Sequence, residues 1–160
     1  YKYKFNSLVI FEGIHVLNPR LLKNLGTSNY FRIYVSPLQS FKTDKMSIST
    51  RNLRLLRRSI RDVDKRGTPM QKTAQMWPEV VAAEEKYIEP YRTKIDYFVD
   101  TMHEYELGVY KSEIERLIKE GKITREDVPY SELLEFIEPI SKSLIPDTSL
   151  MWEFVTKEEK

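Results

Sequence analysis

The sequence has 160 residues, of which 41% are hydrophobic and 31% charged, and a formal net charge of +2. These values are typical of one globular domain, and they exclude a polycation that attracts anions through its overall charge. The sequence lacks cysteine, which excludes disulfides and thiolate metal sites, and its two histidines do not favour a histidine-based zinc site. It shows no apolar run of membrane-spanning length and no signal peptide, so the cytoplasm is the expected compartment.

The first half of the sequence alternates between predicted strands and helices. Residues 7–11 (SLVIF) form an apolar run without polar alternation, as expected for a strand buried on both faces of a parallel sheet. Residues 17–26 predict a short helix, residues 30–36 a second strand and residues 40–50 a polar connector.

A strong helix is predicted from about Arg51 to Lys65, ended by Gly67. Residues 68–94 carry helical signals broken by two prolines, and residues 95–101 (IDYFVDT) predict a third strand. Strands separated by helices indicate an α/β domain with a parallel sheet of about three strands.

The last third of the sequence changes character. Residues 104–121 have helical spacing, and residues 125–145 hold another predicted helix, opened by Asp127 and Pro129 and closed near Pro139. Residues 149–155 form a final apolar piece. We expect this third to be a helical appendage packed on the sheet domain.

The segment RLLRRSIRDVDKRG, residues 54–67, concentrates arginine on one predicted helix. Arg54, Arg57, Arg58 and Arg61 are spaced i, i+3, i+4 and i+7 and are predicted to form one stripe, with Leu53, Leu56, Ile60 and Val63 on the opposite, docking face. Asp62 and Asp64 are not expected on this stripe, so the like charges repel by roughly 0.2–0.5 kcal/mol for each adjacent pair.

The arginine stripe has three interpretations. It is a solvated basic face, a binding surface for a polyphosphate, or a contact for a nucleic-acid backbone. Arginine suits bidentate contacts with phosphate oxygens, and Arg66-Gly67 provides an exit from the helix that leaves a further arginine free to swing. The cluster lies in one helix, without the broad patch and interleaved aromatic residues typical of nucleic-acid binding, so nucleic acid is the less favoured partner.

Glu12 follows the first predicted strand in the segment LVIFEGIH. Open α/β sheets bind ligands at the carboxyl ends of their strands, and a carboxylate there holds Mg2+ directly or through water. The alternative is that Glu12 caps a neighbouring helix or turn. His15 lies in the same turn and is either a substrate contact or a structural histidine.

The sequence has no Walker A motif, G-x-x-x-x-G-K-[ST]. The five glycines are Gly13, Gly26, Gly67, Gly108 and Gly121, and no two of them have the required spacing. By itself, the chain is therefore expected neither to bind ATP in the standard way nor to transfer phosphate.

Several segments together resemble one family of enzymes. They are LVIFEGIHVLNP, RIYVS, ISTRNLRLLRRSIRDVDKRG, MWPEVVAAEEKYIEPYRTKIDYFVDT and SLIPDTSLMWEFV, spread over essentially the whole chain. This combination resembles the uridine kinase/phosphoribulokinase family of P-loop kinases, closest to bacterial uridine kinase-like proteins with a threonyl-tRNA-synthetase-like amino-terminal region. The segments EGIH and RRxxRDxxxRG are the most specific parts of the likeness.

The resemblance implies a fold and a domain division. Residues 1–102 would be the carboxy-terminal half of a P-loop kinase core, with a lid at about 51–78, and residues 103–160 a helical appendage packed on the same domain. The family's P-loop, catalytic aspartate and base-binding hairpin would precede Tyr1. The sequence is therefore expected to be the carboxy-terminal part of a kinase, whose missing amino-terminal part is its first partner.

The resemblance also implies roles for particular residues. Glu12 resembles the acidic residue that helps to hold the Mg2+ of Mg-ATP. Catalytic and ATP-binding roles fall on three residues that resemble the lid arginines, namely Arg58, Arg61 and Arg66. Gln75 or Met76 stands where uridine kinases place a base-contacting glutamine, although QMWP departs from the usual QY, and His15 joins them as a candidate substrate contact.

Three functions follow as hypotheses. The favoured one is a uridine kinase-like phosphotransferase, which moves the γ-phosphoryl group of ATP to a hydroxyl of a nucleoside-like substrate, with this chain inactive on its own. The second is a non-enzymatic module that binds nucleotide or RNA through the arginine stripe. The third is a regulatory or assembly element that has lost kinase chemistry. No membrane partner is expected, and a homo-oligomer remains open.

Overall fold

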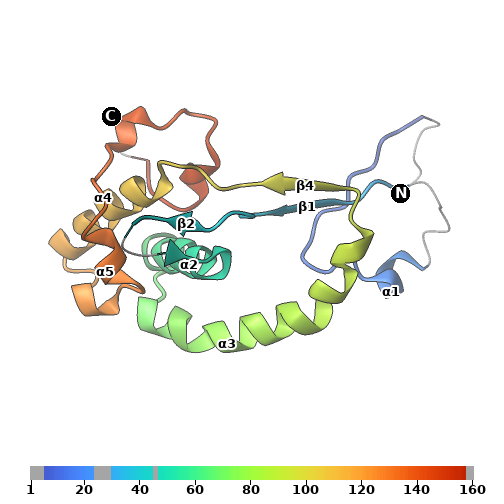
Figure 1. The fold of residues 1–160 in the computed structure, drawn as a ribbon, viewed down its shortest axis with the longest axis horizontal. Coiled ribbons are helices and arrows are strands. Elements are labelled where there is room, and N and C mark those ends of the chain that lie inside the picture. Colours follow the sequence, from blue (N-terminus) through green and yellow to red (C-terminus); the bar gives the residue numbers. More distant parts are fainter. Residues whose placement is uncertain (1–5, 24–29, 45–46, 158–160) are drawn as a thin grey trace.

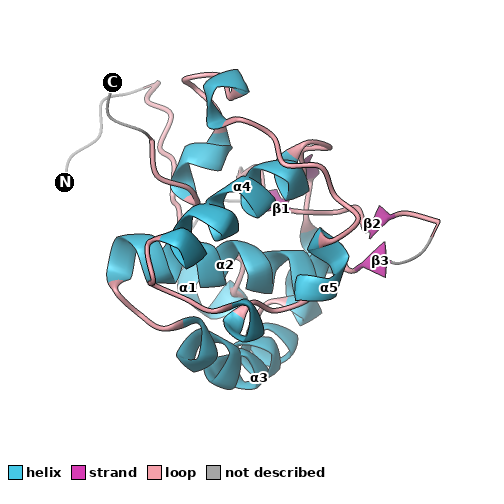
Figure 2. Cartoon of the chain, turned by 90° about the vertical axis from the view of Figure 1, so that its left-hand side faces the viewer, coloured by secondary structure: helices cyan, strands magenta, loops and turns pink. Residues whose placement is uncertain are grey.

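The computed structural model describes residues 6–23, 30–44 and 47–157, and it is elongated with two distinct ends (Figure 1). Helices α2, α4 and α5 gather at one end with the last residues of the chain, and residues 6–23 lie at the other. A two-stranded sheet and the long helix α3 connect these ends, and Figure 2 shows the helical end face on.

The elements follow one another in the order α1 (Pro19–Leu22), β1 (Ile33–Ser36), β2 (Phe41–Lys42), β3 (Ser47–Ile48), α2 (Thr50–Arg66), α3 (Met70–Tyr87), η1 (Glu89–Lys94), β4 (Tyr97–Asp100), α4 (Glu106–Lys119), η2 (Arg125–Asp127), α5 (Ser131–Leu134), η3 (Lys142–Leu144) and η4 (Leu150–Glu153), where η denotes a 3-10 helix. Within these residues, no helix has the length and apolar character needed to cross a membrane.

The parallel sheet has two strands. β1 pairs with β4 in parallel, with Ile33 opposite Tyr97 and Ser36 opposite Asp100, which confirms an α/β chain and the strands predicted at 30–36 and 95–101. The connector at 40–50 contains a short antiparallel pair, β2 with β3.

The strand predicted at residues 7–11 does not form. Leu8 is 89% exposed and Ile10 83% exposed, and the segment pairs with no other strand among the described residues. A buried parallel strand needs hydrogen-bonding neighbours and covering helices, and the described chain provides neither at this position. The prediction of three strands in the parallel sheet was therefore wrong. The short helix predicted at 17–26 forms in part as α1, with Pro19 at its start; residues 24–26 lie outside the described ranges.

The arginine-rich helix forms as predicted. The hydroxyl of Ser49 accepts a hydrogen bond from the Asn52 backbone N–H at the start of α2, and Gly67 ends it in the left-handed conformation, with φ of 62°. Leu53, Leu56 and Ile60 are fully buried, as their helical spacing predicts.

α3 runs through Pro78, where a break was predicted. Pro78 is exposed, and the adjacent Trp77 is buried, with the Arg54 guanidinium 5.9 Å from its ring centroid. Packing of the helix against α2 therefore outweighs the loss of one backbone hydrogen bond.

α4 confirms the helix predicted at 104–121. The helix predicted within 125–145, opened by Asp127 and Pro129 and closed near Pro139, is much shorter than expected, since only Ser131–Leu134 (α5) is α-helical there. That region contains only the short pieces η2, α5 and η3. Tyr130 has a φ of 60°, which interrupts the right-handed helix before Ser131, and the side chains of Thr124 and Asp127 cap only a single turn.

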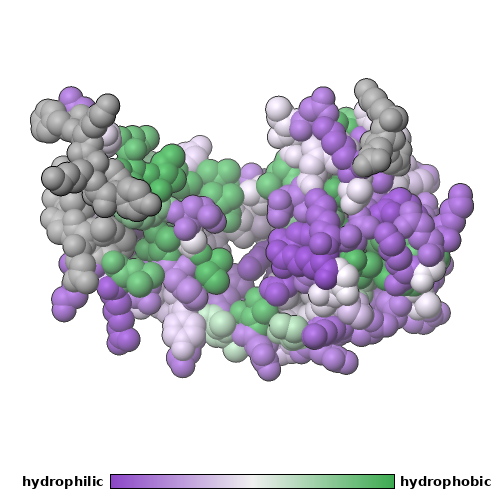
Figure 3. All heavy atoms as spheres, turned by 180° about the vertical axis from the view of Figure 1, so that it is seen from behind, coloured by the Kyte–Doolittle hydropathy of each residue, from purple (hydrophilic) through white to green (hydrophobic). Residues whose placement is uncertain are grey.

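One core joins the helical elements of both parts of the chain. It includes Ile48, Leu53, Leu56, Ile60, Met70, Leu107, Tyr110, Leu117, Met151 and Val155, all less than 2% exposed. In contrast to this buried core, apolar side chains gather on the surface at the sheet end of the molecule (Figure 3). Those more than half exposed are Leu8, Ile10, Phe11, Ile14, Leu21, Phe31, Ile33, Val35 and Tyr97.

Candidate functional site

Arg57 leaves the predicted stripe and enters the core. Its side chain is 5% exposed and its Nε donates to Oε2 of Glu106 at 2.8 Å, while Nη2 donates to the carbonyl of Thr101 at 2.7 Å. Phe154 covers the guanidinium, with the ring centroid 5.0 Å away, and Tyr110 donates to the same Glu106 oxygen at 3.0 Å. These contacts give Arg57 a structural place between α2 and α4.

The three predicted lid arginines meet around Asp62, and we call these four residues the Asp62 cluster. Arg58 Nε lies 3.4 Å from Oδ2 of Asp62, Arg66 Nη1 lies 3.2 Å from Oδ1, and Arg61 Nε lies 3.6 Å from Oδ1. Thr73 of α3 also donates to Oδ2 at 3.2 Å. The Asp62 side chain is 6% exposed, so one buried carboxylate positions three cations.

This arrangement corrects two expectations about the helix. Asp62 was not expected to neutralise the arginines, yet its i,i+4 spacing to Arg58 and Arg66 places it between them. Arg66 was expected to swing at the Gly67 exit, yet it is bound to Asp62, and the Gly67 N–H donates to the Asp62 carbonyl. The stripe is therefore an organised set of ion pairs.

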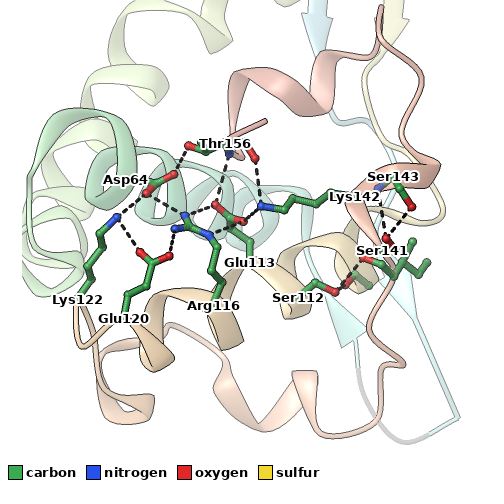
Figure 4. A network of polar contacts seen from close by, with 12 residues as sticks. Asp64, Ser112, Glu113, Arg116, Glu120, Lys122, Ser141, Lys142, Ser143 and Thr156 are labelled. Carbon is green, nitrogen blue, oxygen red and sulfur yellow. Dashed lines mark hydrogen bonds and ion pairs between the residues drawn. The ribbon is translucent and has the colours of Figure 1, made fainter. Parts of the chain in front are cut away.

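Asp64 makes no ion pair with an arginine of the stripe, in line with its predicted place off it, and it joins a network between α2, α4 and the last described segment (Figure 4). It accepts from Arg116 at 2.9 Å, from Lys122 at 3.1 Å and from the Thr156 hydroxyl. Burial alone would raise the pKa of Asp64, but hydrogen bonds from Thr156, Arg116 and Lys122 outweigh it and hold that pKa well below its ordinary value.

The same network contains a second buried carboxylate. Glu113 is fully buried and accepts from Arg116 at 2.7 Å and from Lys142 at 3.0 Å, and Figure 4 shows these side chains converging from α4 and the last segment. The pKa of Arg116 is raised above its ordinary value, chiefly by its hydrogen bonds to Glu113. The network therefore fastens the end of the chain to α2 and α4.

The predicted metal and substrate residues of the first segment lie on the surface. Glu12 and His15 are exposed, and the His15 ring meets the edge of the Tyr87 ring at a centroid distance of 6.2 Å. Among the residues that the structure describes, no three histidine, cysteine, aspartate or glutamate side chains are grouped to hold a metal ion.

Gln75 and Met76 are also exposed, but they lie elsewhere on α3. Twelve residues separate Gln75 from Tyr87, which corresponds to about 18 Å along the helix axis at 1.5 Å per residue. Because His15 contacts Tyr87, the structure does not gather His15, Gln75 and Met76 into one site.

A cleft of about 360 Å3 lies where β1 ends and α2 begins, and we call it the β1 cleft. Its wall includes Ser36, Pro37 and Leu38 after the strand and Arg51 and Arg54 of the helix. Sequence reasoning missed this site because two further wall residues, Glu84 and Arg92, come from distant parts of the chain.

Asp100, at the end of β4, fixes the loop that borders the β1 cleft. Its carboxylate accepts from the backbone N–H of Leu38 at 3.0 Å, from the Gln39 amide at 3.0 Å and from the Met102 N–H at 2.9 Å. Burial alone would raise the pKa of Asp100, but the bonds from Met102 and Leu38 outweigh it and keep that pKa below its ordinary value.

Comparison with known proteins adds no relative. No family model, no curated protein and no solved structure matches this chain.

Proposed function

We propose that this chain is the lid-bearing carboxy-terminal portion of an ATP-dependent, uridine kinase-like phosphotransferase of the P-loop class. The observation that carries the proposal is the Asp62 cluster, in which one carboxylate holds three arginines of one helix. The proposed reaction transfers the γ-phosphoryl group of Mg-ATP to a hydroxyl of a nucleoside-like acceptor.

The charge of the Asp62 cluster supports binding of an anion. Three guanidinium groups share Asp62, and within the described ranges only Arg61 has a second acidic neighbour, Glu153 at 3.7 Å. The side chains of Arg58, Arg61 and Arg66 are 32%, 21% and 53% exposed, so solvent and ligands reach the cluster. A phosphate group would accept from the N–H groups that point away from Asp62.

Arg61 gives the most specific support. Its Nε is buried and makes no hydrogen bond within the described chain, since Asp62 Oδ1 is 3.6 Å away. Buried donors are almost always paired, so this N–H is suited to an acceptor supplied by a ligand. In the proposed reaction, Arg61 would draw away from Asp62 and donate to oxygens of the transferring phosphoryl group.

The chemistry assigns each group a separate task. A new P–O bond forms to the acceptor hydroxyl as the bond to the ADP oxygen breaks, and the arginines stabilise charge on the equatorial oxygens. Glu12 would supply a carboxylate of the kind that Mg2+ accepts, with the phosphates as further ligands, once the segment 6–23 moves from the opposite end of the molecule toward α2. The P-loop and the base that takes the hydroxyl proton would come from another part of the kinase.

The exposed sheet is consistent with such a larger assembly. Strands of parallel sheets normally have neighbours and both faces covered, whereas Ile33 and Val35 of β1 are more than half exposed. Further strands of a kinase core would cover these side chains and complete the sheet.

The decisive experiment has two steps. The coding region upstream of Tyr1 is sequenced, and G-x-x-x-x-G-K-[ST] followed by a strand ending in aspartate is expected there. The intact parent is then assayed for ATP-dependent phosphorylation of uridine and related nucleosides, with Arg61→Ala and Glu12→Gln as variants.

Both variants are expected to lower turnover, with Arg61→Ala lowering it by about 10³-fold or more, the effect of removing an arginine that stabilises phosphoryl transfer. Arg125→Ala, at an exposed ion pair with Glu135, is the matched control and is expected to keep full turnover. Unchanged turnover in both site variants would refute the residue roles. Magnesium-independent binding that weakens steeply with salt would favour the nucleic-acid-binding alternative.

A further inference from the structure

The β1 cleft brings together three arginines from two separate elements. Arg51 and Arg54 come from the first two turns of α2, and Arg92 comes from η1, which follows α3. At about 360 Å3 the cleft falls at the lower end of the size range of small-molecule sites. Its position at the carboxyl end of β1 is also where open α/β sheets bind their ligands.

Each arginine contacts a carboxylate with only part of its guanidinium group. Arg54 uses Nη1 for both oxygens of Glu84, at 2.5 and 2.6 Å, and Arg92 uses Nη1 for both oxygens of Glu89, at 3.0 and 3.2 Å. The Nε and Nη2 donors of these arginines lie outside the two ion pairs. Arg92 is also oriented by Tyr34, whose ring centroid is 5.0 Å from the guanidinium carbon.

The donor groups of the cleft wall favour an anion over a cation, although each of its arginines already pairs with one glutamate. The wall carries three arginines against two glutamates, Glu84 and Glu89, and Glu84 is nearly buried beneath Arg54 with 7% of its side chain exposed. Arg51 pairs at 3.0 Å with Glu85, which is not part of the wall. The first turn of α2 carries no acidic residue, so the positive end of the helix dipole adds to the arginine charges.

We propose that the β1 cleft is a binding subsite for the phosphate group of a small phosphomonoester, with Arg54 and Arg92 as its bidentate donors and Arg51 at its rim. A phosphate dianion carries enough charge to compete for the donors that the ion pairs leave available. The subsite is distinct from the Asp62 cluster, because no residue of that cluster lines the β1 cleft, although Arg58 lies only one helical turn, about 6 Å, along α2 from Arg54. Phosphate binding at the β1 cleft therefore does not depend on the proposed kinase activity.

The test uses the 160-residue chain and inorganic phosphate at constant ionic strength, with chloride as the comparison anion. Nuclear magnetic resonance follows the backbone amides of Thr50 and Arg51 and the Nε–H groups of Arg54 and Arg92. We expect saturable shifts at these positions with phosphate, and about tenfold weaker binding or more in Arg92→Met, since that variant removes one charge-assisted donor group. Arg92 is suitable because its partner Glu89 lies three residues away on the same short helix.

Two further variants separate the possible results. Arg54→Lys keeps a cation for the buried Glu84 but loses the bidentate fork, so it is expected to weaken phosphate binding while the chain stays folded. Arg125→Met, far from the cleft, is expected to bind phosphate normally. The absence of saturable shifts, equal binding by Arg92→Met, or an equal loss in Arg125→Met would each overturn the proposal.

Discussion

Arg57 and Glu106 form an ion pair inside the core, with Arg57 Nη2 2.7 Å from Oε2 of Glu106 and the two side chains 5% and 0% exposed. The pair joins α2 to the first turn of α4, and Tyr110 and Thr101 provide the remaining hydrogen bonds. Burial of Tyr110, together with the charge of Glu106, raises the pKa of its hydroxyl well above the ordinary value. A buried pair of this kind stabilises the fold only while both partners are present.

We expect Arg57→Met to lower the free energy of unfolding by about 3–5 kcal/mol, because the buried carboxyl group of Glu106 then loses its hydrogen-bonded partner. Urea unfolding of the chain at neutral pH measures the change. Arg51→Met is the control, since the exposed pair of Arg51 with Glu85 contributes about 0–1 kcal/mol. Equal effects of the two substitutions would contradict a core role for Arg57.

We expect Gly108→Ala to destabilise the chain by about 1–3 kcal/mol through overpacking. A Cβ atom at this position would lie 2.7 Å from two side-chain carbons of Ile140 and 2.8 Å from the carbonyl oxygen of Glu138. Thermal unfolding measures the loss, and Gly108→Ala combined with Ile140→Val is expected to recover part of it. A neutral Gly108→Ala would mean that the segment around Ile140 does not pack against α4 as described.

Stability is expected to fall as the pH drops below about 5. Asp64 and Asp100 both have a folded pKa below the ordinary value of 3.8, so the folded chain binds fewer protons than the unfolded chain. Their contribution is fully present above the unfolded pKa and is lost as the pH falls through the folded pKa. Urea midpoints between neutral pH and pH 3 measure this loss.

Asp64→Asn identifies the source of the pH dependence. This variant is expected to be less stable than the unmodified chain at pH 7 and to lose less stability on acidification, since its side chain no longer titrates. Asp147→Asn is the matched control, because Asp147 is 87% exposed and pairs with Lys157 at the surface. An identical pH profile for Asp64→Asn and the unmodified chain would refute the assignment.

We expect the isolated chain to bind a hydrophobic dye such as anilinonaphthalene sulfonate at its sheet end. Val35→Thr with Ile33→Thr is expected to reduce dye fluorescence, because these side chains are 62% and 53% exposed on β1. Leu144→Thr, an exposed apolar residue at the helical end, is the control and should change the signal least. Equal dye binding by the double variant would exclude the sheet as the apolar surface.

The local features of α2 could be predicted from the sequence because they depend on neighbouring residues. Its stop at Gly67 follows from the freedom of glycine to adopt positive φ, and its buried leucines follow from helical spacing. The position of Asp62 between Arg58 and Arg66 was also available from i,i+4 spacing, although we expected otherwise.

Features that depend on distant partners could not be predicted. Arg57 enters the core because Glu106 and Thr101, more than forty residues away, provide its hydrogen bonds. The run at 7–11 has the composition of a strand but no partner among the described residues, and the β1 cleft joins residues from Tyr34 to Arg92. The roles of Glu12, His15, Gln75 and Met76 stay predictions.

The links between α2 and α3 have a mechanical consequence. Arg51 with Glu85, Arg54 with Glu84 and Asp62 with Thr73 tie the helices at both ends, and the capped Gly67 closes the turn between them. The two helices should therefore move as one rigid body, and the ion pairs of Arg57 with Glu106 and of Asp64 with Arg116 extend that body to α4. Any hinge motion of the chain would then move the three helices together and leave the spacing between the β1 cleft and the Asp62 cluster unchanged.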